Sequence, residues 1–273
     1  MKTLIWFAAP AFALLILLET LYDLWQKTHE YEVKDTVTNI TLGFVSMFMD
    51  LGWKLFIQVP AYWLLYNLTP LRIPQTWWSW GIVMILVDFA YYWFHRFSHE
   101  SRFFWNFHVV HHSSEHYNLS VAVRQSWFGG AVSWVFYAPI ALMGFDPMMI
   151  ITAYAINLIY QFWIHTKFIK SLGPLEAILN TPAHHRVHHG VNEPYLDKNY
   201  AGMLIIWDRM FGSFTPEIET PRYGIIKPLR SFNPVWANFH AWVETFETMR
   251  TRVGLGEKLR CIWSAPAMLP KAP

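Results

Sequence analysis

Four stretches of the chain are long and apolar enough to predict helices in a membrane. A bilayer core of about 30 Å needs about 20 largely apolar residues for each spanning helix. Residues 4–22 contain Glu19 as their one charge. No small-residue cleavage site follows them, so we expect an anchor helix rather than a removable signal peptide. The other three are residues 77–94, in which Asp88 is the one charge, and residues 127–145 and 148–164, which have none.

Residues 36–71 form a fifth apolar stretch that allows two interpretations. Asp50 and Lys54, one helical turn apart, divide it into uncharged runs of 14 and 17 residues. The stretch fits one long tilted helix or two shorter helices that meet at an interface. We therefore expect an all-α polytopic membrane protein with four to five membrane helices, capped by a cytosolic helical domain.

The turn between the last two apolar stretches decides how the polar segments are arranged. Asp146-Pro147 is typical of a tight turn. Residues 127–165 are then a helical hairpin with an even number of crossings. Ser126 and His165 emerge on the same face, so the polar segments on either side of the hairpin are able to build one shared site.

The remaining sequence is polar and rich in His, Arg, Pro and Asn. Residues 95–126 and 166–273 together hold sixteen of the 21 Lys and Arg residues. Basic residues accumulate on the cytoplasmic side of membrane proteins, so we expect both segments in the cytoplasm. Within the second segment, residues 233–249 predict an interfacial helix.

Composition excludes several classes of protein. Hydrophobic residues make up 54% of the 273 residues and charged residues 15%, against about 25% in ordinary soluble proteins. A net charge of +2 gives no excess for binding phosphates, so nucleic acid is not an expected partner. The single cysteine, Cys261, cannot form an intrachain disulfide.

The histidines are clustered and regularly spaced. Eleven of the thirteen lie between residues 95 and 189. They form one H-x3-H pattern in HRFSH and two H-x2-H-H patterns, in HVVHH and HHRVHH. Residues i, i+3 and i+4 share a face of a helix, so each pattern directs two or three imidazoles toward one region. Neutral imidazole is a good ligand for iron, zinc, copper or nickel, and this number of rings exceeds what one tetrahedral ion uses. We therefore expect two metals.

Two alternatives start from the same residues. Histidines also gather at membrane interfaces without a function, and grouped histidines act as pH sensors in some proteins. Protonated rings at this density would repel one another, whereas a bound metal removes that repulsion. A metal transporter is a further alternative, and it predicts ligands at the membrane midplane rather than at helix ends.

Three further residues lie near these patterns. His165 ends an apolar stretch on the predicted site face and is a candidate ligand. His184 precedes the third pattern and is expected to support a ligand rather than to bind the metal. Asp88 lies nearly two helical turns before His95 and is expected either to accept the second ring N–H of a ligand histidine or to pair with a buried Tyr or Arg.

Five segments resemble the fatty acid hydroxylase / sterol desaturase superfamily, and within it the alkylglycerol monooxygenase branch. They are HRFSHE, HVVHHSSEHYNLSVAVRQS, QFWIHT, NTPAHHRVHHG and DKNYAGMLIIWDRMFGSF. The resemblance runs from about residue 86 to residue 214. It implies a non-haem di-iron centre that uses O2. It implies the following metal ligands: His95, His99, His108, His111, His112, His165, His185, His188 and His189.

The resemblance also implies an activity and partners. We expect a multi-pass membrane oxygenase that hydroxylates an aliphatic C–H bond of a bilayer lipid, with cleavage of alkyl ether lipids as one form of that reaction. Sterol, fatty-acyl and ornithine-lipid hydroxylation or desaturation are the alternatives. No His-Pro-Gly-Gly haem-binding run is present, so we expect a separate electron donor of the tetrahydropterin, ferredoxin or cytochrome b5 type. Residues 1–94, 95–126, 127–165 and 166–273 would then form one integrated catalytic domain.

Overall fold

Two long apolar helices form one side of the molecule in the computed structural model, which describes residues 4–266. The first is α1 (Leu4–Gln26), and the second is α2 (Val33–Trp53), which continues through a π-helical segment (Lys54–Gln58) into α3 (Val59–Leu68). Of the two interpretations of this stretch, the structure therefore has one continuous helix. Pro60 explains the π-helical turn before it, because proline has no N–H for the carbonyl four residues earlier and its ring crowds that carbonyl.

Fewer helices than predicted meet the requirements for crossing a bilayer. By length and composition, Phe7–Gln26 and Val33–Leu68 are the two candidate spans among the described residues. The helices α7 (Gly130–Leu142) and α8 (Pro147–Phe162) are apolar but have 13 and 16 residues, below the length of about 20 that a span needs. The predicted all-helical fold is confirmed for residues 4–266, which contain no β-strand, whereas the count of four to five membrane helices is not.

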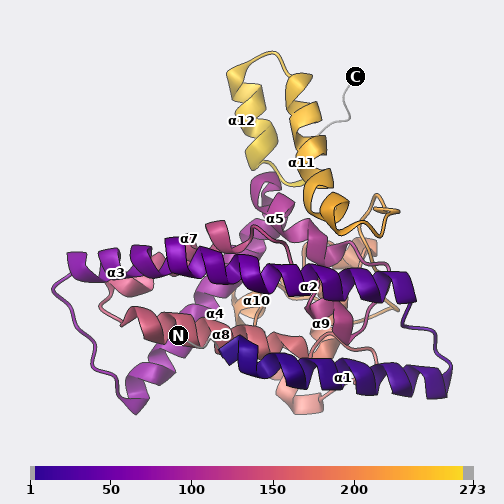
Figure 1. Cartoon of the computed structure of the whole chain (residues 1–273), viewed down its shortest axis with the longest axis horizontal. Coiled ribbons are helices and arrows are strands. Elements are labelled where there is room, and N and C mark those ends of the chain that lie inside the picture. Colours follow the sequence, from indigo (N-terminus) through magenta and orange to yellow (C-terminus); the bar gives the residue numbers. More distant parts are fainter. Residues whose placement is uncertain (1–3, 267–273) are drawn as a thin grey trace.

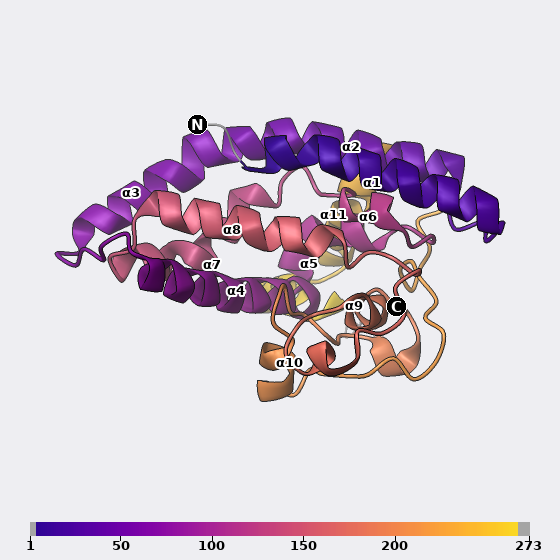
Figure 2. The ribbon, with the colours of Figure 1, turned by 90° about the horizontal axis from the view of Figure 1, so that it is seen from below.

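The core lies where α4 (Trp77–Glu100) packs against α7 and α8. Val83 and Val87 of α4 are fully buried there, beside Tyr137 of α7 and Met149 of α8. The Asp146 carboxylate accepts a hydrogen bond from the Met148 N–H (2.7 Å) and caps α8, as the predicted tight turn requires. Figure 2 shows α8 between the α1–α2 layer and α4.

The polar segments gather at the end of the bundle where α4 ends. They contain α5 (Arg102–His112), α6 (Leu119–Ala122), α9 (Pro182–His188) and α10 (Ile206–Met210). Figure 2 shows α9 and α10 together beyond the end of α4. The helices α11 (Pro234–Arg250) and α12 (Leu255–Trp263) form a hairpin that projects from the body next to α5 (Figure 1), and α11 matches the helix predicted over residues 233–249.

Candidate metal centre

All nine histidines that the sequence singled out as ligands lie together. They form two groups, and within each group one ring nitrogen per residue lies within 4.8 Å of the others. The first group is His95, His99, His108, His112 and His188, and the second group is His111, His165, His185 and His189. Both groups contain residues from sequence segments on each side of the α7–α8 hairpin.

A sharp corner in the chain brings the first two histidine patterns together. His95 and His99 occupy the last turns of α4, and Ser101 is the one residue between α4 and α5. Its backbone is extended, with φ −128° and ψ 127°, so the chain turns away from the axis of α4 before α5 begins. The ring centroids of His95 and His108 are consequently 4.7 Å apart.

The two groups divide each H-x2-H-H pattern between them. Residues four apart stay together, as His108 and His112 do in the first group and His185 and His189 do in the second. The adjacent residue on the helix points about 100° away. His111 therefore joins the second group and His188 joins the first. The expectation that each pattern points at one region was thus too coarse for the two H-x2-H-H patterns, because each of them supplies histidines to both groups.

Backbone carbonyls fix the orientation of four rings. A carbonyl oxygen only accepts hydrogen bonds, so the Nδ1 that contacts it carries the proton. His95 donates to the Tyr200 carbonyl (2.7 Å) and His165 to the Gln161 carbonyl (2.8 Å). His188 donates to the Lys198 carbonyl (3.0 Å) and His111 to the Arg124 carbonyl (3.2 Å). In the neutral ring, Nε2 is then left with a lone pair that points into its group.

The contact between His111 and His165 is the strongest sign that a cation belongs in the second group. Their Nε2 atoms are 3.2 Å apart. Both rings already use Nδ1–H for a carbonyl, so neither neutral ring has a proton to donate to the other. Two lone pairs facing each other at this distance repel, and a metal ion coordinated by both nitrogens would replace that repulsion by two bonds.

Burial keeps these rings in the form that binds a metal. Burial lowers the pKa of His111 to about 4 and lowers the pKa values of His165 and His185 well below the usual range. The same cause lowers the pKa values of His108, His112 and His188 in the first group. Neutral imidazole is the metal-binding form, so protons compete weakly for these ligands.

The spacing between ring nitrogens also fits coordination. Bonds of about 2.1 Å between a metal and imidazole nitrogens place neighbouring ligands about 3 Å apart when they are at right angles. In the second group, the Nε2 atom of His185 lies 2.9 Å from that of His165 and 3.2 Å from that of His189. In the first group, Nε2 of His108 lies 2.9 Å from that of His95 and 3.0 Å from that of His112. Both groups therefore fit one metal ion each.

Four other histidines lie outside both groups. They are His29, His116, His184 and His240. The ring of His184 packs edge-on against Phe214, with centroids 5.5 Å apart, and its buried Nδ1 has no hydrogen-bond partner among the described residues. The predicted role of His184 beside a ligand therefore stays a prediction.

The predicted hydrogen-bond partner of Asp88, a histidine ring, is wrong. Its carboxylate accepts hydrogen bonds from the side chains of Asn157 (2.6 Å) and Trp207 (2.9 Å) rather than from a histidine ring. It also accepts from the N–H groups of Met203 (2.7 Å) and Leu204 (3.1 Å). Asp88 thus ties α4 to α8 and to the loop that follows Tyr200, whose carbonyl orients His95.

Replacing Asp88 by asparagine is expected to loosen this loop. The amide nitrogen of asparagine would face N–H donors, so at least one hydrogen bond is lost. Bonds to charged groups contribute about 1.5–3 kcal/mol each, and we expect the free energy of unfolding to fall by about 3 kcal/mol. Thermal unfolding in detergent measures the change. The exposed Glu193→Gln is the control, and equal stability of the two variants would contradict this role.

Asp208 is a supporting residue that the sequence patterns did not single out. It is fully buried, and its carboxylate accepts hydrogen bonds from the N–H groups of Tyr200 and Ala201, both at 2.8 Å. It thereby holds the segment whose carbonyl orients His95. The available signal was one acidic residue in the apolar run LIIWDRMF.

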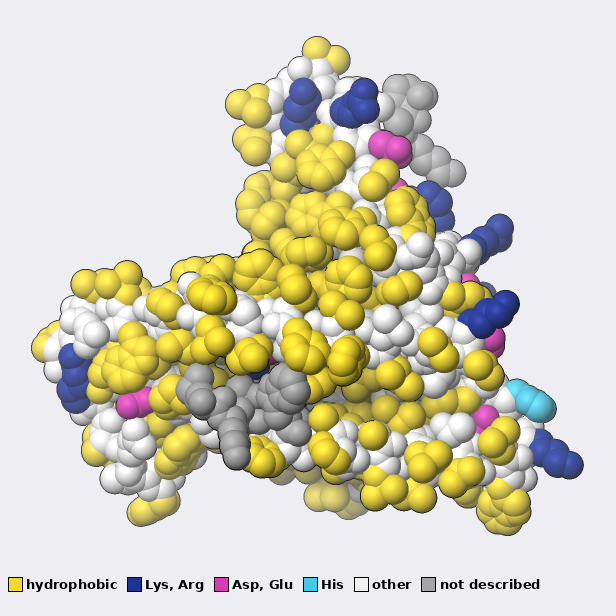
Figure 3. All heavy atoms as spheres, in the orientation of Figure 1, with side chains coloured by type: hydrophobic (Ala, Val, Ile, Leu, Met, Phe, Trp, Pro, Cys, Tyr) yellow, Lys and Arg dark blue, Asp and Glu magenta, His cyan; other side chains and the backbone are white. Residues whose placement is uncertain are grey.

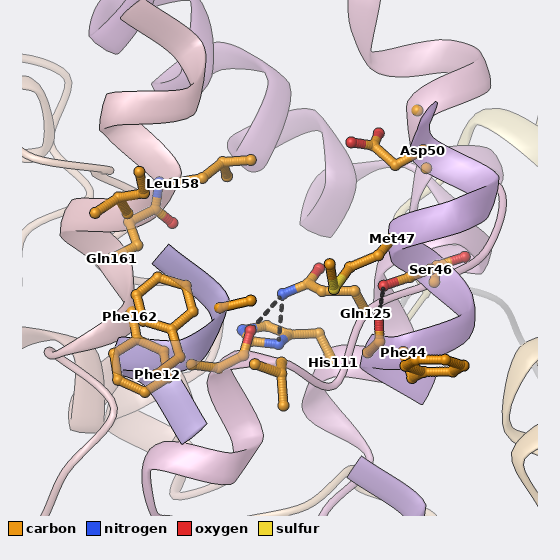
Figure 4. A pocket seen from close by; sticks show the side chains of 18 of the residues that line it. Phe12, Phe44, Ser46, Met47, Asp50, His111, Gln125, Leu158, Gln161 and Phe162 are labelled. Atoms are coloured by element: carbon orange, nitrogen blue, oxygen red, sulfur yellow. Dashed lines mark hydrogen bonds between the residues drawn. The ribbon is translucent and has the colours of Figure 1, made fainter. Parts of the chain in front are cut away.

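An apolar cavity of about 660 Å³ lies against the second histidine group. His108, His111 and His165 form part of its wall, which otherwise comes mainly from α1, α2 and α8. Figure 4 shows Phe12 and Phe162 on one side of His111 and Met47 on the other. The charged side chains on the wall, Asp50 and Lys54, are paired with each other at 2.5 Å. Pockets of this size and apolar character bind small organic ligands.

Comparisons with known proteins agree with this site. Residues 80–213 match a family model described as fatty acid hydroxylase, and this range contains all nine histidines. No solved structure matches the chain.

Several relatives are named as lipid enzymes. The chain is 44% identical to an alkylglycerol monooxygenase of Danio rerio over 271 residues and 42% identical to that of Homo sapiens over 272 residues. Each match covers 97% of this chain, which spans 60% of the length of those relatives. An ornithine lipid hydroxylase of Rhizobium tropici is 28% identical over 135 residues, which are 48% of this chain and 40% of that protein. The family match and these identities together identify residues 80–213 as a domain of the fatty acid hydroxylase family.

Proposed function

We propose that this protein is an integral-membrane di-iron oxygenase that hydroxylates an aliphatic C–H bond of a lipid. One observation carries the proposal. Two groups of largely buried histidines lie side by side, and three of those histidines form part of the wall of an apolar cavity. A metal pair with a lipid-sized cavity against it fits oxidation of a hydrocarbon chain better than transport of the metal.

The proposed ligands are the nine histidines of the two groups. Bound there, two iron ions would supply the activation of O2, with one oxygen atom entering a C–H bond and the other leaving as water. The two electrons and two protons that this requires would come from a separate donor. The all-imidazole donor set suits iron, although ligand type alone also suits zinc or copper.

The residues of the chain would position the substrate and exclude water from the site. The cavity would hold an alkyl chain between α1, α2 and α8, with one of its carbon atoms beside His108 and His111. The apolar wall excludes water, which protects the oxidant. The carbonyls of Tyr200, Gln161 and Lys198 hold the rings in place, so little reorganisation is needed when the substrate binds.

Alkyl ether lipids are the proposed substrates. The names of the similar proteins from Danio rerio and Homo sapiens support this class. Hydroxylation of the carbon next to an ether oxygen gives a hemiacetal, which collapses to an aldehyde and a free alcohol. The distant similarity to an ornithine lipid hydroxylase keeps hydroxylation of an acyl chain as the second candidate.

We also propose a multi-pass arrangement with the histidine end in the cytoplasm. The two candidate spans and the accumulation of Lys and Arg in residues 95–126 and 166–273 support it. In this orientation the part of the cavity wall that α1 and α2 form would lie within the bilayer, whereas the metal groups would be within reach of a cytosolic electron donor.

Metal analysis combined with a product assay tests the function. The purified full chain should contain about two iron ions per molecule, as two ligand groups imply. With O2 and a reductant it should convert an alkylglycerol to an aldehyde and glycerol. Conversion of an ornithine lipid or a sterol instead would replace the proposed substrate. Absence of iron, with zinc movement across vesicles, would favour the transporter alternative.

Filling the cavity is expected to block turnover without removing the metal. Met47→Trp would place a large ring where Figure 4 shows the Met47 side chain pointing into the cavity. Overpacking costs about 1–3 kcal/mol of binding, so activity on long-chain substrates should fall about 10- to 100-fold with the metal content unchanged. The control is Leu55→Trp, on the same helix but exposed and outside the cavity wall. Equal activity of the two variants would show that the substrate binds elsewhere.

A further inference from the structure

The α11–α12 hairpin projects from the body but is firmly attached at its base. On its inner face, Thr245 of α11 and Asn106 of α5 exchange hydrogen bonds of 3.1 and 3.2 Å. Asn238 accepts a hydrogen bond from the Trp127 N–H (3.0 Å), just before α7. The orientation of the hairpin is therefore fixed relative to the rest of the molecule.

The outer face of α11 carries an exposed apolar stripe. Its residues recur at spacings of four, four and three, which place them on one side of a helix. The side chains of the stripe are 38–56% exposed. The stripe consists of Val235, Phe239, Val243 and Phe246. Phe239 contacts Phe128 at the base of the hairpin, with ring centroids 5.6 Å apart, but packing inside the chain leaves the stripe exposed, because the buried face of α11 consists of other residues, such as Ala237 and Ala241.

The second helix repeats the pattern. Leu255, Leu259 and Trp263 of α12 lie four residues apart and are exposed by 73%, 48% and 57%. Glu257 and Arg260 occupy other sides of the helix. A short helix with apolar residues on one side and charges on the others is typical of helices that lie in the surface of a membrane.

The direction of the hairpin agrees with such a location. In Figure 1 its two helices run across the direction of α1 and α2. If α1 and α2 cross the bilayer, the hairpin lies parallel to the bilayer plane. Figure 3 shows hydrophobic side chains on the hairpin and on the adjoining surface along α2. The apolar stripes thus extend the surface that would face lipid.

The charge near the tip favours anionic lipids. Between residues 250 and 260 the chain has four basic side chains and one acidic side chain, Glu257. The basic residues are Arg250, Arg252, Lys258 and Arg260. Each basic residue near an anionic bilayer contributes about 1 kcal/mol of attraction. A second copy of the chain is the alternative occupant of the stripes. The excess of positive charge near the tip would repel the same charge on such a copy, so it favours an anionic bilayer.

We propose that the α11–α12 hairpin is an interfacial anchor that inserts its two apolar stripes into the headgroup boundary of a leaflet containing anionic lipid. The anchor would hold the histidine end of the molecule at a fixed depth. This goes beyond the proposed oxygenase function and relies only on the membrane orientation. An enzyme with a different activity would still have the anchor.

Spin labelling of the full chain in vesicles tests the anchor. Single cysteines are placed at Leu259, in the α12 stripe, and at Glu257, on another side of the same helix. Cys261 is buried, so the unsubstituted chain gives the labelling background, and a Cys261→Ala chain repeats the test without that cysteine. Neither new position touches the histidine groups, and metal content checks that each variant is folded.

The two labels should respond in opposite ways in vesicles of phosphatidylcholine and phosphatidylglycerol. The Leu259→Cys label should collide more with O2, which concentrates in lipid, and less with an aqueous nickel complex. The Glu257→Cys label should show the reverse. Equal access of both labels to nickel would overturn the proposal. So would spin–spin broadening at position 259 that disappears on dilution with unlabelled chain, because a second copy would then cover the stripe.

Discussion

Replacing His111 by alanine is expected to remove one metal ion and to abolish turnover. His111 is one of the four proposed ligands of the second group and lies on the cavity wall, so the variant would lose a metal bond beside the proposed substrate site. A metal ion contributes several kcal/mol to such chemistry, which corresponds to a loss on the order of 100-fold or more in kcat. Metal analysis and the product assay measure both effects.

His116→Ala is the matched control for that experiment. His116 lies in the same segment, HHSSEHYN, but outside both histidine groups. It is partly exposed, so its removal should leave metal content and activity near those of the unsubstituted chain. Two equivalents of metal and full turnover in the His111 variant would end the di-metal assignment. Equal losses in both variants would indicate damage to α5 rather than the loss of a ligand.

Replacing Arg124 by methionine is expected to produce the largest loss of stability. The Arg124 guanidinium is buried and donates hydrogen bonds to the Val110 carbonyl (2.7 Å), Ser113 Oγ (2.8 Å) and Asn39 Oδ1 (2.7 Å). It also lies 3.6 Å from the buried Asp35 carboxylate. Without it, that carboxylate has no charge partner among residues 4–266, and breaking a buried pair in this way costs about 3–5 kcal/mol.

The same substitution should also weaken metal binding. The Arg124 side chain joins α2 to the end of α5, and its own backbone carbonyl orients His111. Thermal unfolding in detergent and metal content are the two measurements. Adding Asp35→Asn should recover part of the lost stability, because the uncompensated charge is then gone. Arg222→Met, at an exposed position, is the control. Full stability of the Arg124 variant would show that the network contributes nothing.

Local helical spacing was enough to predict which pairs of histidines stay in one group. The i, i+4 pairs His95/His99, His108/His112 and His185/His189 each stay within one group, because a helical turn brings such residues to the same face. The hairpin predicted for residues 127–165 also brings His165 to the same end of the molecule as the segments on both sides of the hairpin. Both inferences use only chain geometry over short distances.

The division into two groups could not be predicted in this way. It depends on the angle between α4 and α5 at Ser101 and on the position of α9 against both helices. The partners of Asp88 depend likewise on packing between residues more than 60 positions apart, such as Asn157 and Trp207. The carbonyls that orient the rings carry no side-chain signal, because every residue has a carbonyl group.

The amino-acid sequence alone established the apolar stretches, the helical class, the nine ligand candidates and the family resemblance. Each depends on residue type and on spacing within a few helical turns, which local covalent geometry already constrains. The three-dimensional packing alone decided which ring faces which, where the cavity lies against His111, and that α11 and α12 project with apolar stripes uncovered. These features arise from contacts between distant segments, whose free energies depend on how the whole chain packs.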